Sequence, residues 1–458
     1  MKERERFGSR LGFILLSAGC AIGLGNVWKF PMMVGSGGGG IFVLIYLICL
    51  IFIGLPVMIM EFSCGRAAQA SPVRIHETLT PEKKPWRIHG ILSLIACVML
   101  MMFYTTVAGW ILRYSFKSIT GQFKGLDSNE VAGVFSDMLG NPWQMLIFTA
   151  IVAVLASFIC SLGLNGGLEA ITKYMMIALL AIMVFIAGYS FTLKGAGEGL
   201  SFYLKPDFSA INGKVIAGAM NQALFSLSLG IGSMAIFGSY IGKERSLMGE
   251  SVNVILLDTF VAIVAGLIIF PACFTYGIEP NIGGGLLFVT LPNVFNTLPG
   301  GAVWGALFFI FMTFAAFSTV IAVYEMIIAS LIELTGWNRK LVSLIVCVGL
   351  IILNIPMILG NNVWSGFHPF GLAGKDVSDL EDFFVSYLML PLGSITYILY
   401  CTTKFGWGWK NFLAEANAGK GMKVKKWTRW YMTIVLPILM FTIFVIGILT
   451  YFGIMKTQ

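Results

Sequence analysis

Residues 17–31 read Ser17-Ala18-Gly19-Cys20-Ala21-Ile22-Gly23-Leu24-Gly25-Asn26-Val27-Trp28-Lys29-Phe30-Pro31, and they lie in the middle of the first apolar segment of the chain. Three glycines fall within seven residues, and each costs about 1 kcal/mol relative to alanine inside a helix. In lipid, a broken helix needs other partners for its free N–H and C=O groups, or a polar cavity to face. We therefore expect two half-helices with unwound backbone between them. The alternative is that the glycines only allow helices to pack closely.

The composition is that of a polytopic helical membrane protein. Of the 458 residues 57% are apolar and 11% are charged, the mean hydropathy is +0.86, and apolar runs long enough to span a bilayer recur throughout. No cleavable signal peptide is expected, because the charged N-terminus leads directly into a membrane segment. The eight cysteines fall in or beside apolar segments without CxxC spacing, so they are interpreted as small hydrophobic residues.

Eleven transmembrane helices are expected in a single all-α transmembrane domain that covers residues 1–458. Their approximate ranges are 11–34, 40–62, 88–116, 142–163, 168–193, 214–240, 249–276, 302–334, 340–359, 381–403 and 430–453. Most of the 30 lysine and arginine residues lie on one side of this topology, which predicts a cytoplasmic N-terminus and an external C-terminus. This bias accounts for the net charge of +8 without a nucleic-acid partner. Residues 283–292 are expected to form an extracellular loop that caps the bundle.

The glycine pattern of the first segment recurs halfway along the chain. The Gly-x-Gly pattern of Gly23-Leu24-Gly25 occurs again as Gly230-Ile231-Gly232 in the sixth segment. We expect inverted five-helix repeats, helices 1–5 at about 8–195 and helices 6–10 at about 212–403, with broken helices 1 and 6 and an extra helix 11 at about 430–453. Two glycine-interrupted segments at corresponding positions of such repeats indicate the central binding site of a transporter.

Oxygen-bearing side chains gather in the same segments. Ser226 and Ser228 precede the glycines of the sixth segment, Asp258 lies in an apolar run of the seventh, and Ser318-Thr319 lies inside the eighth. A carboxylate at membrane depth is costly unless a cation or donor faces it, and hard oxygen ligands suit a small hard cation. The alternative is that the hydroxyls only bond to their own helix.

Further acidic residues and histidines extend this list of candidates. Glu61 and Glu325 are additional possible ligands, and Glu61 could instead satisfy unwound backbone or lie near headgroup water. The three histidines, at 76, 89 and 368, are expected in loops. Because no nucleophile–base pair or metal-binding motif lies at membrane depth, an intramembrane enzyme is disfavoured, as is a receptor that does not transport.

The motifs of the first helix resemble the neurotransmitter:sodium symporter family, in the form of a bacterial amino-acid transporter with eleven helices. The matching stretches are Arg10 to Leu15, Gly19 to Pro31, Gly37 to Gly40, Gly54-Leu55-Pro56, Ser226 to Gly230 and Phe317-Ser318-Thr319. The resemblance implies Na⁺-driven uptake of amino acids or amines by alternating access around a midplane site. It covers helices 1 to 10.

The resemblance also implies specific ligands. A first Na⁺ would use the carbonyls of Ala21 and Ser226 with the side chains of Asn26, Ser226 and Asp258. A second Na⁺ would use the carbonyls of Gly19, Ile22 and Ala315 with the hydroxyls of Ser318 and Thr319. The substrate carboxylate would meet the N–H groups of Leu24 and Gly25 and the hydroxyl of Tyr104. The substrate amine would face carbonyls of Ala21, Phe225 and Ser226, together with Ser228, and the side-chain pocket would be formed by Cys20, Leu100, Phe225, Ile231, Ser318 and Val323.

Gate residues are carried over in the same way. Lys29 and Asp382 resemble the outer gate pair, and Arg4 and Glu333 the inner pair, with Tyr240 nearby. Three departures from the family pattern stand out: Lys29 replaces the usual arginine, Ile177 stands where many relatives have a helix 5 proline, and helix 12 is missing.

The sequence therefore predicts a Na⁺-coupled symporter, not an enzyme, in the inner membrane of a bacterium. The expected substrate is a hydrophobic, aromatic α-amino acid, the expected cofactors are two Na⁺ ions without chloride, and a homodimer is possible. The alternative is an H⁺-coupled amino-acid symporter of the same architecture, with Asp258 as the proton carrier.

Overall fold

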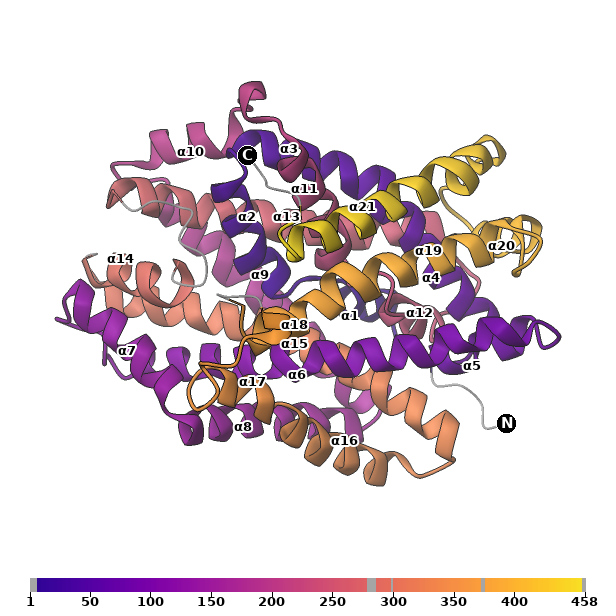
Figure 1. Cartoon of the computed structure of the whole chain (residues 1–458), viewed down its shortest axis with the longest axis horizontal. Helices are drawn as coiled ribbons and strands as arrows, with labels where there is room; N and C mark the ends of the chain where they lie inside the picture. The colour runs from indigo at the N-terminus through magenta and orange to yellow at the C-terminus, as the bar shows by residue number, and fades with distance from the viewer. Residues whose placement is uncertain (1–5, 278–285, 298–299, 372–374, 455–458) are drawn as a thin grey trace.

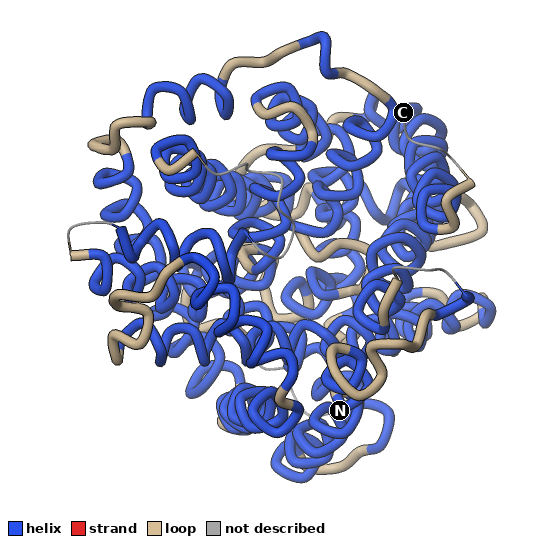
Figure 2. The backbone as a smooth tube through the Cα atoms, turned by 60° about the vertical axis from the view of Figure 1, so that its left-hand side comes forward, coloured by secondary structure: helices blue, strands red, loops and turns tan. Residues whose placement is uncertain are grey.

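The computed structural model describes residues 6–277, 286–297, 300–371 and 375–454. Within these ranges the regular structure is helical apart from two isolated β-bridges, and the helices pack into one bundle (Figure 2). The predicted all-α membrane fold is confirmed. All eight cysteines are buried and free. Two of the three histidines depart from the predicted loops, because His76 lies in the short helix α5 and His89 in the long helix α6.

Each of the eleven predicted segments falls on helical backbone. In order they are α1 (Arg10–Ala21) with η1 (Gly25–Lys29) and α2 (Phe30–Ser36); α3 (Gly40–Cys49) with η2 (Leu50–Gly54) and α4 (Leu55–Ala68); α6 (Arg87–Ile119); α8 (Pro142–Ser161); η4 (Leu164–Glu169) with α9 (Ala170–Ser190); α11 (Gly213–Ser226) with α12 (Ser233–Gly238); α13 (Leu247–Thr275); α15 (Gly301–Thr335); α16 (Arg339–Leu353) with α17 (Ile355–Gly360); α18 (Val377–Asp382) with η8 (Phe383–Met389) and α19 (Leu390–Thr402); and η10 (Tyr431–Val435) with α21 (Leu436–Tyr451).

Two of these segments are broken, as predicted. In the described ranges nine helices are long and apolar enough to cross a membrane, and the first segment becomes a tenth if its two halves, bent by 51°, count as one span. The sixth predicted segment is missing from that count because residues 227–232 divide it into α11 and α12, which are too short to qualify separately. The relation of helices 1–5 to helices 6–10 as inverted repeats stays a prediction.

The short helices lie at the two ends of the bundle. In Figure 1, α5 (Pro72–Leu79) and α20 (Trp409–Ala416) lie at one end, which we call the α5 end. The opposite α14 end carries α7 (Ser128–Gly140), α10 (Ala196–Leu204) and α14 (Leu291–Thr297).

The predicted capping loop lies at the α14 end. Residues 283–285 of that loop lie outside the described ranges, and the rest forms η6 (Leu286–Thr290) and the start of α14. The ring of Phe288 in η6 packs against the rings of Trp28, Trp110, Tyr114 and Phe135. The described part of the loop therefore packs against η1 of the first span and the last turns of α6.

The centre of the bundle holds the break in the first helix. The two longest helices, α6 and α15, pack along each other, and α1 packs against α15, α9 and α13. Residues of α1 from Leu15 to Ala21 are buried. Because unsatisfied backbone is costly away from water, the surrounding helices must supply its polar partners, and these partners form the candidate site.

Candidate functional site

The first helix unwinds beside α15. α1 ends at Ala21, and the next residue, Ile22, has the extended angles φ −72° and ψ 98°. A Cβ atom on Gly23 would lie 2.3 Å from both the Thr319 hydroxyl and the Tyr104 hydroxyl. A residue without a side chain is therefore required at position 23, and the close approach brings two hydroxyls to the unwound backbone.

The sixth segment unwinds opposite the first. Ser228, Gly230 and Gly232 all have positive φ, at 51°, 89° and 79°, a region that glycine adopts without strain and other residues rarely do. The N–H of Gly230 donates to Oε1 of Glu61 across 2.5 Å. Glu61 is fully buried, and its contact fits the predicted alternative in which it satisfies unwound backbone.

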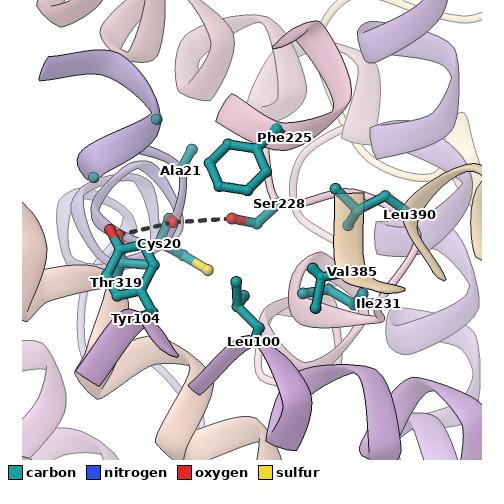
Figure 3. Close-up of a pocket in the computed structure, with 12 residues that line it drawn as sticks. Cys20, Ala21, Leu100, Tyr104, Phe225, Ser228, Ile231, Thr319, Val385 and Leu390 are labelled. Carbon is teal, nitrogen blue, oxygen red and sulfur yellow. Dashed lines mark hydrogen bonds between the residues drawn. The ribbon is translucent and has the colours of Figure 1, made fainter. Parts of the chain in front are cut away.

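A narrow pocket lies between the two breaks (Figure 3). Its lining residues are Cys20, Ala21, Gly23, Gly25, Leu100, Tyr104, Phe225, Ser228, Ile231, Thr319, Val385 and Leu390. Figure 3 shows the hydroxyls of Ser228 and Thr319 directed at the carbonyl of Cys20, each across 3.2 Å. The cavity volume is about 20 Å³, room for about one water molecule. The walls must therefore move outward to admit an amino-acid side chain.

The pocket has a polar end and an apolar end. At the polar end, the N–H of Leu24 donates to the Tyr104 hydroxyl across 2.8 Å. At the other end Leu100 and Ile231 are joined by two residues that the sequence analysis missed, Val385 in η8 and Leu390 at the start of α19. Among the residues predicted to bind substrate, four are buried but do not line this cavity: Leu24, Ser226, Ser318 and Val323.

Three of the four residues predicted for the first Na⁺, Asn26, Ser226 and Asp258, come together in the structure. Nδ2 of Asn26 donates to Oδ1 of Asp258 across 2.8 Å, and the Tyr46 hydroxyl lies 3.0 Å from Oγ of Ser226 and 3.4 Å from Oδ2 of Asp258. Nε2 of Gln222 donates to the carbonyl of Gly25 across 2.7 Å. All of these side chains are buried.

This cluster has the chemistry of a cation site. Within the described ranges, Oδ1 of Asn26 and Oε1 of Gln222 are buried and have no hydrogen-bond partner. Asp258 is completely buried, and in the described ranges its carboxylate contacts donors of Asn26 and Tyr46 but no basic side chain. A buried carboxylate needs a compensating charge, and the donor set present, carbonyl and carboxylate oxygens, fits a small hard cation.

The residues predicted for the second Na⁺ are also brought together. Oγ of Ser318 lies 3.3 Å from the carbonyl oxygen of Ile22 and 2.9 Å from that of Ala315. Oγ1 of Thr319 lies 3.3 Å from the carbonyl oxygen of Gly19 and 3.4 Å from that of Ile22. The Ser318 hydroxyl therefore bonds across to the first helix as well as back to α15, and the Thr319 hydroxyl bonds across to the first helix. The alternative of own-helix bonding alone is wrong for both residues.

The predicted outer pair lies between the pocket and the α14 end. Nζ of Lys29 is 3.1 Å from Oδ1 of Asp382 and 3.9 Å from the centroid of the Phe225 ring. Phe225 lines both the narrow pocket and a second cavity of about 240 Å³, which Trp28, Lys29 and Asp382 also line. Phe225 and the ion pair thus separate the two cavities.

The predicted inner group is only partly described, because Arg4 lies outside the described ranges. Both oxygens of Glu333 lie 3.0 Å from the N–H of Ser71. The Tyr240 hydroxyl donates to Oε1 of Glu325 across 2.7 Å, and Glu325 also pairs with Arg339 at 2.7 Å. The sequence indicates Glu325 as a possible cation ligand. In the structure its carboxylate instead contacts Tyr240 and Arg339 at the α5 end of the bundle.

Sequence reasoning missed a second contact at this end. The carboxylate of Glu169, in η4, accepts hydrogen bonds from the N–H groups of Gly8 and Ser9 across 2.8 and 3.1 Å, and from Oγ of Ser9 across 2.8 Å. It therefore satisfies backbone N–H groups that precede α1. No local pattern reveals this contact, because its partners lie 160 residues apart.

Comparison of the sequence with known proteins identifies the family of this chain. The model of the sodium:neurotransmitter symporter family matches residues 4–136 and 129–457. The chain belongs to this family. A sodium-dependent transporter of Bacillus subtilis is 32% identical over 98% of this chain and 100% of its own length. A sodium-dependent transporter of Haemophilus influenzae is 32% identical over 97% of this chain and 98% of its own.

A solved structure agrees with the family assignment. The crystal structure of MhsT in complex with L-phenylalanine is 36% identical to this chain, covers 97% of it and 100% of the MhsT chain, and has a TM-score of 0.89. The protein is thus a sodium-dependent membrane transporter with a small-molecule substrate, and not an enzyme. The family resemblance stated from the sequence is confirmed.

Proposed function

We propose that this sodium-dependent transporter imports a hydrophobic, aromatic α-amino acid together with Na⁺, without a requirement for chloride. The observation that carries the proposal is the convergence of backbone carbonyls freed by the break in helix 1 with the Ser318 and Thr319 hydroxyls, directly beside the narrow pocket. A cation bound there would hold the unwound backbone in the shape that the pocket requires, so ion binding and substrate binding are coupled.

The substrate class follows from the two ends of the pocket. The N–H of Leu24, in the break of the first helix, offers a donor to a carboxylate, as helix N-termini commonly do, and the Tyr104 hydroxyl lies 2.8 Å from it. Leu100, Ile231, Val385 and Leu390 form an uncharged wall for the side chain. The related MhsT was crystallised with L-phenylalanine, which supports an aromatic substrate.

Two Na⁺ ions are proposed. The first is held by Ala21, Asn26, Ser226 and Asp258, and the second by Gly19, Ile22, Ala315, Ser318 and Thr319. The orphaned Oδ1 of Asn26 and the buried Asp258 support the first site. The hydroxyl and carbonyl contacts between α15 and the first helix support the second.

Chloride independence rests on the same Asp258. Its carboxylate lies beside Tyr46 and Ser226, with Gln222 close to the first helix, and it supplies the fixed negative charge that a bound anion would otherwise supply. A second candidate function is H⁺-coupled transport with Asp258 as the proton carrier, favoured by the complete burial of this carboxylate.

The orientation is proposed from the positive residues. The α5 end carries the basic loops and faces the cytoplasm, and the α14 end faces outward. The protein then lies in the plasma membrane of a bacterium, with its N-terminus inside and its C-terminus outside. Lys29 and Asp382 close the outer path, and the contacts of Tyr240, Glu333 and the first helix close the inner path. A homodimer is compatible with this arrangement.

The test is uptake of radiolabelled phenylalanine into proteoliposomes that contain the purified protein. An inward Na⁺ gradient should drive accumulation, and equimolar choline without a pH gradient should not. Accumulation driven by an inward H⁺ gradient in Na⁺-free buffer would favour the second candidate. Phenylalanine uptake equal to that of protein-free liposomes under both gradients, while another amino acid accumulates, would overturn the aromatic substrate alone.

A further inference from the structure

The segment between α19 and η10 is strongly basic. We call residues 404–430, which include α20, the basic strap. Its seven cations are all exposed: Lys404, Lys410, Lys420, Lys423, Lys425, Lys426 and Arg429. Its sequence contains a single carboxylate, Glu415. The strap therefore carries a large excess of positive charge at the α5 end (Figure 1).

The one carboxylate does not neutralise these cations. Oε1 of Glu415 pairs with Nε of Arg66 in α4 at 2.6 Å, and its Oε2 lies 3.2 Å from Nζ of Lys243. In the described ranges, none of the seven strap cations forms an ion pair with a carboxylate. Their charge is available to an external anion.

Large apolar side chains alternate with the cations. Phe405 is 81% exposed, Trp427 68%, Trp430 57% and Met422 51%. Trp427 and Trp430 lie in the first turns of the last apolar span, Lys426–Tyr451, just before η10. Aromatic residues at the end of a span lie at the level of the lipid headgroups. The strap therefore presents both cations and apolar side chains at the depth of the membrane surface.

The strap is held in a fixed shape by the body of the protein. Gly419 and Gly421, with φ of 82° and 127°, form a turn around Lys420. The N–H of Lys420 donates to the carbonyl of Glu244 across 2.9 Å, and the N–H of Ser246 donates to the carbonyl of Lys420 across 3.0 Å. Because the backbone is already ordered, little backbone conformational entropy is lost when the cations bind a ligand.

We propose that the basic strap binds the headgroups of anionic glycerophospholipids in the leaflet that the α5 end faces. The inference rests on the orientation given under Proposed function and not on the substrate or the coupling ion. Each lysine close to an anionic surface strengthens binding about fivefold. A soluble acidic partner would contact the cations alone, whereas a phospholipid supplies a phosphate to the cations and acyl chains to Trp427 and Trp430 together.

The test uses the purified full chain, depleted of lipid in a neutral detergent. Native mass spectrometry measures binding of dioctanoyl-phosphatidylglycerol and of dioctanoyl-phosphatidylcholine, which differ in headgroup charge but not in acyl chains. We expect the wild type to bind phosphatidylglycerol at least about tenfold more tightly. The combined variant Lys420→Gln, Lys423→Gln, Lys425→Gln and Lys426→Gln should lose this preference, and Lys→Arg replacements at the same four positions should keep it.

The matched control removes the same number of exposed charges at the other end of the protein. It combines Lys124→Gln, Lys194→Gln, Lys205→Gln and Lys214→Gln, and it should retain the wild-type preference. Equal loss in this control, or full retention in the strap variant, would overturn the proposal. Displacement of phosphatidylglycerol by an equal concentration of inorganic phosphate would also overturn it, because it would show a site for any small anion.

Discussion

Nδ2 of Asn26 donates to Oδ1 of Asp258 across 2.8 Å and thereby joins the broken first helix to α13. The other amide atom, Oδ1 of Asn26, is buried and has no hydrogen-bond partner in the part of the chain that the structure describes. A side chain that is half satisfied in this way is costly in a low-dielectric interior. The same two residues are ligands in the proposed first Na⁺ site. Substitutions at this site therefore test whether transport is coupled to Na⁺.

The variants Asn26→Ala and Thr319→Ala should abolish Na⁺-driven uptake. Each removes one oxygen ligand from a small cation in a buried site, and an uncompensated change of this kind costs several kcal/mol. The measurement is initial uptake in proteoliposomes over a range of Na⁺ concentrations. The control is Ser330→Ala, because Ser330 is buried on the same helix as Thr319 and its hydroxyl, in the described ranges, donates only to the sulfur of Met326 in that helix. Full uptake by either variant in Na⁺-free choline buffer would contradict the proposed coupling.

The transporter should select α-amino acids over decarboxylated amines. Aminergic members of the family place an aspartate where this chain has Gly23, so here the substrate must supply its own carboxylate. We expect tyramine and tryptamine to compete much more weakly than tyrosine and tryptophan for radiolabelled phenylalanine. Gly23→Asp should lose uptake altogether, because its Cβ would lie 2.3 Å from the hydroxyls of Tyr104 and Thr319. Tyramine that competes as strongly as tyrosine would refute this selectivity.

Charged side chains should be rejected by the pocket. Leu100, Ile231, Val385 and Leu390 offer no hydrogen-bonding side chain, and burying an unpaired charge against them costs several kcal/mol. Lysine and glutamate should therefore compete at least about a hundredfold more weakly than tyrosine. Tyrosine, tryptophan and leucine should differ less, because an apolar pocket discriminates by only about 1–3 kcal/mol per methylene. Strong competition by lysine would refute an apolar pocket.

The breaks in helices 1 and 6 could be predicted because their cause is local. Glycines that lower helix propensity lie inside apolar segments at Gly23 and again at Gly230 and Gly232, and the structure unwinds at both places. Lys29 and Asp382 were paired through the family resemblance, and the structure brings them to 3.1 Å. The breaks need no knowledge of how the helices pack, whereas the pair, 353 residues apart, was carried over from the family.

Contacts that depend on packing could not be predicted in this way. Val385 and Leu390 reach the pocket because α19 approaches so closely that a Cβ on Gly393 would lie 1.8 Å from the carbonyl oxygen of Gly230. The hydrophobic residues of η8 and α19 look alike in sequence, and nothing local distinguishes the two that line the pocket. The prediction that His76 and His89 lie in loops was wrong because it relied on their polarity. Helix packing buries both side chains.

Acidification should destabilise the protein through His76. In the short helix α5, burial and the neighbouring His89 lower the pKa of the His76 imidazole well below its usual value. The unfolded chain then binds a proton near pH 6.5 that the folded chain does not. The free energy of unfolding should therefore fall as the pH decreases below about 6.5 and be fully retained above it.

The measurement is the thermal unfolding midpoint of the detergent-purified protein at pH 8, 7, 6 and 5. His76→Gln should show a smaller fall between pH 7 and pH 5 than the wild type. His368→Gln is the control, because His368 is exposed. Identical pH profiles for the wild type and His76→Gln would exclude His76 as the source of the acid sensitivity.

Transport by the wild type should not depend on chloride, and substitution of Asp258 and Ala262 should make it depend on chloride. Chloride-dependent animal members of the family have an asparagine at the position of Asp258 and a serine at that of Ala262. Tyr46 and Ser226 already lie beside Asp258, and Gln222 contacts the first helix nearby. Replacing the fixed carboxylate by an amide removes the negative charge that balances Na⁺, and a bound anion can restore that balance. The alternative is that Asp258 acts only as a Na⁺ ligand that still tolerates chloride nearby.

The test of this last prediction replaces chloride by gluconate at constant Na⁺ and measures phenylalanine uptake in proteoliposomes. Wild-type uptake should be unchanged, whereas Asp258→Asn combined with Ala262→Ser should transport only when chloride is present. The single variant Ala262→Ser is the control and should remain indifferent to chloride, since it keeps the carboxylate. Collapse of wild-type uptake in gluconate would show that Asp258 does not substitute for the anion. Uptake by the double variant that is equal in chloride and gluconate would show that the carboxylate is a Na⁺ ligand alone.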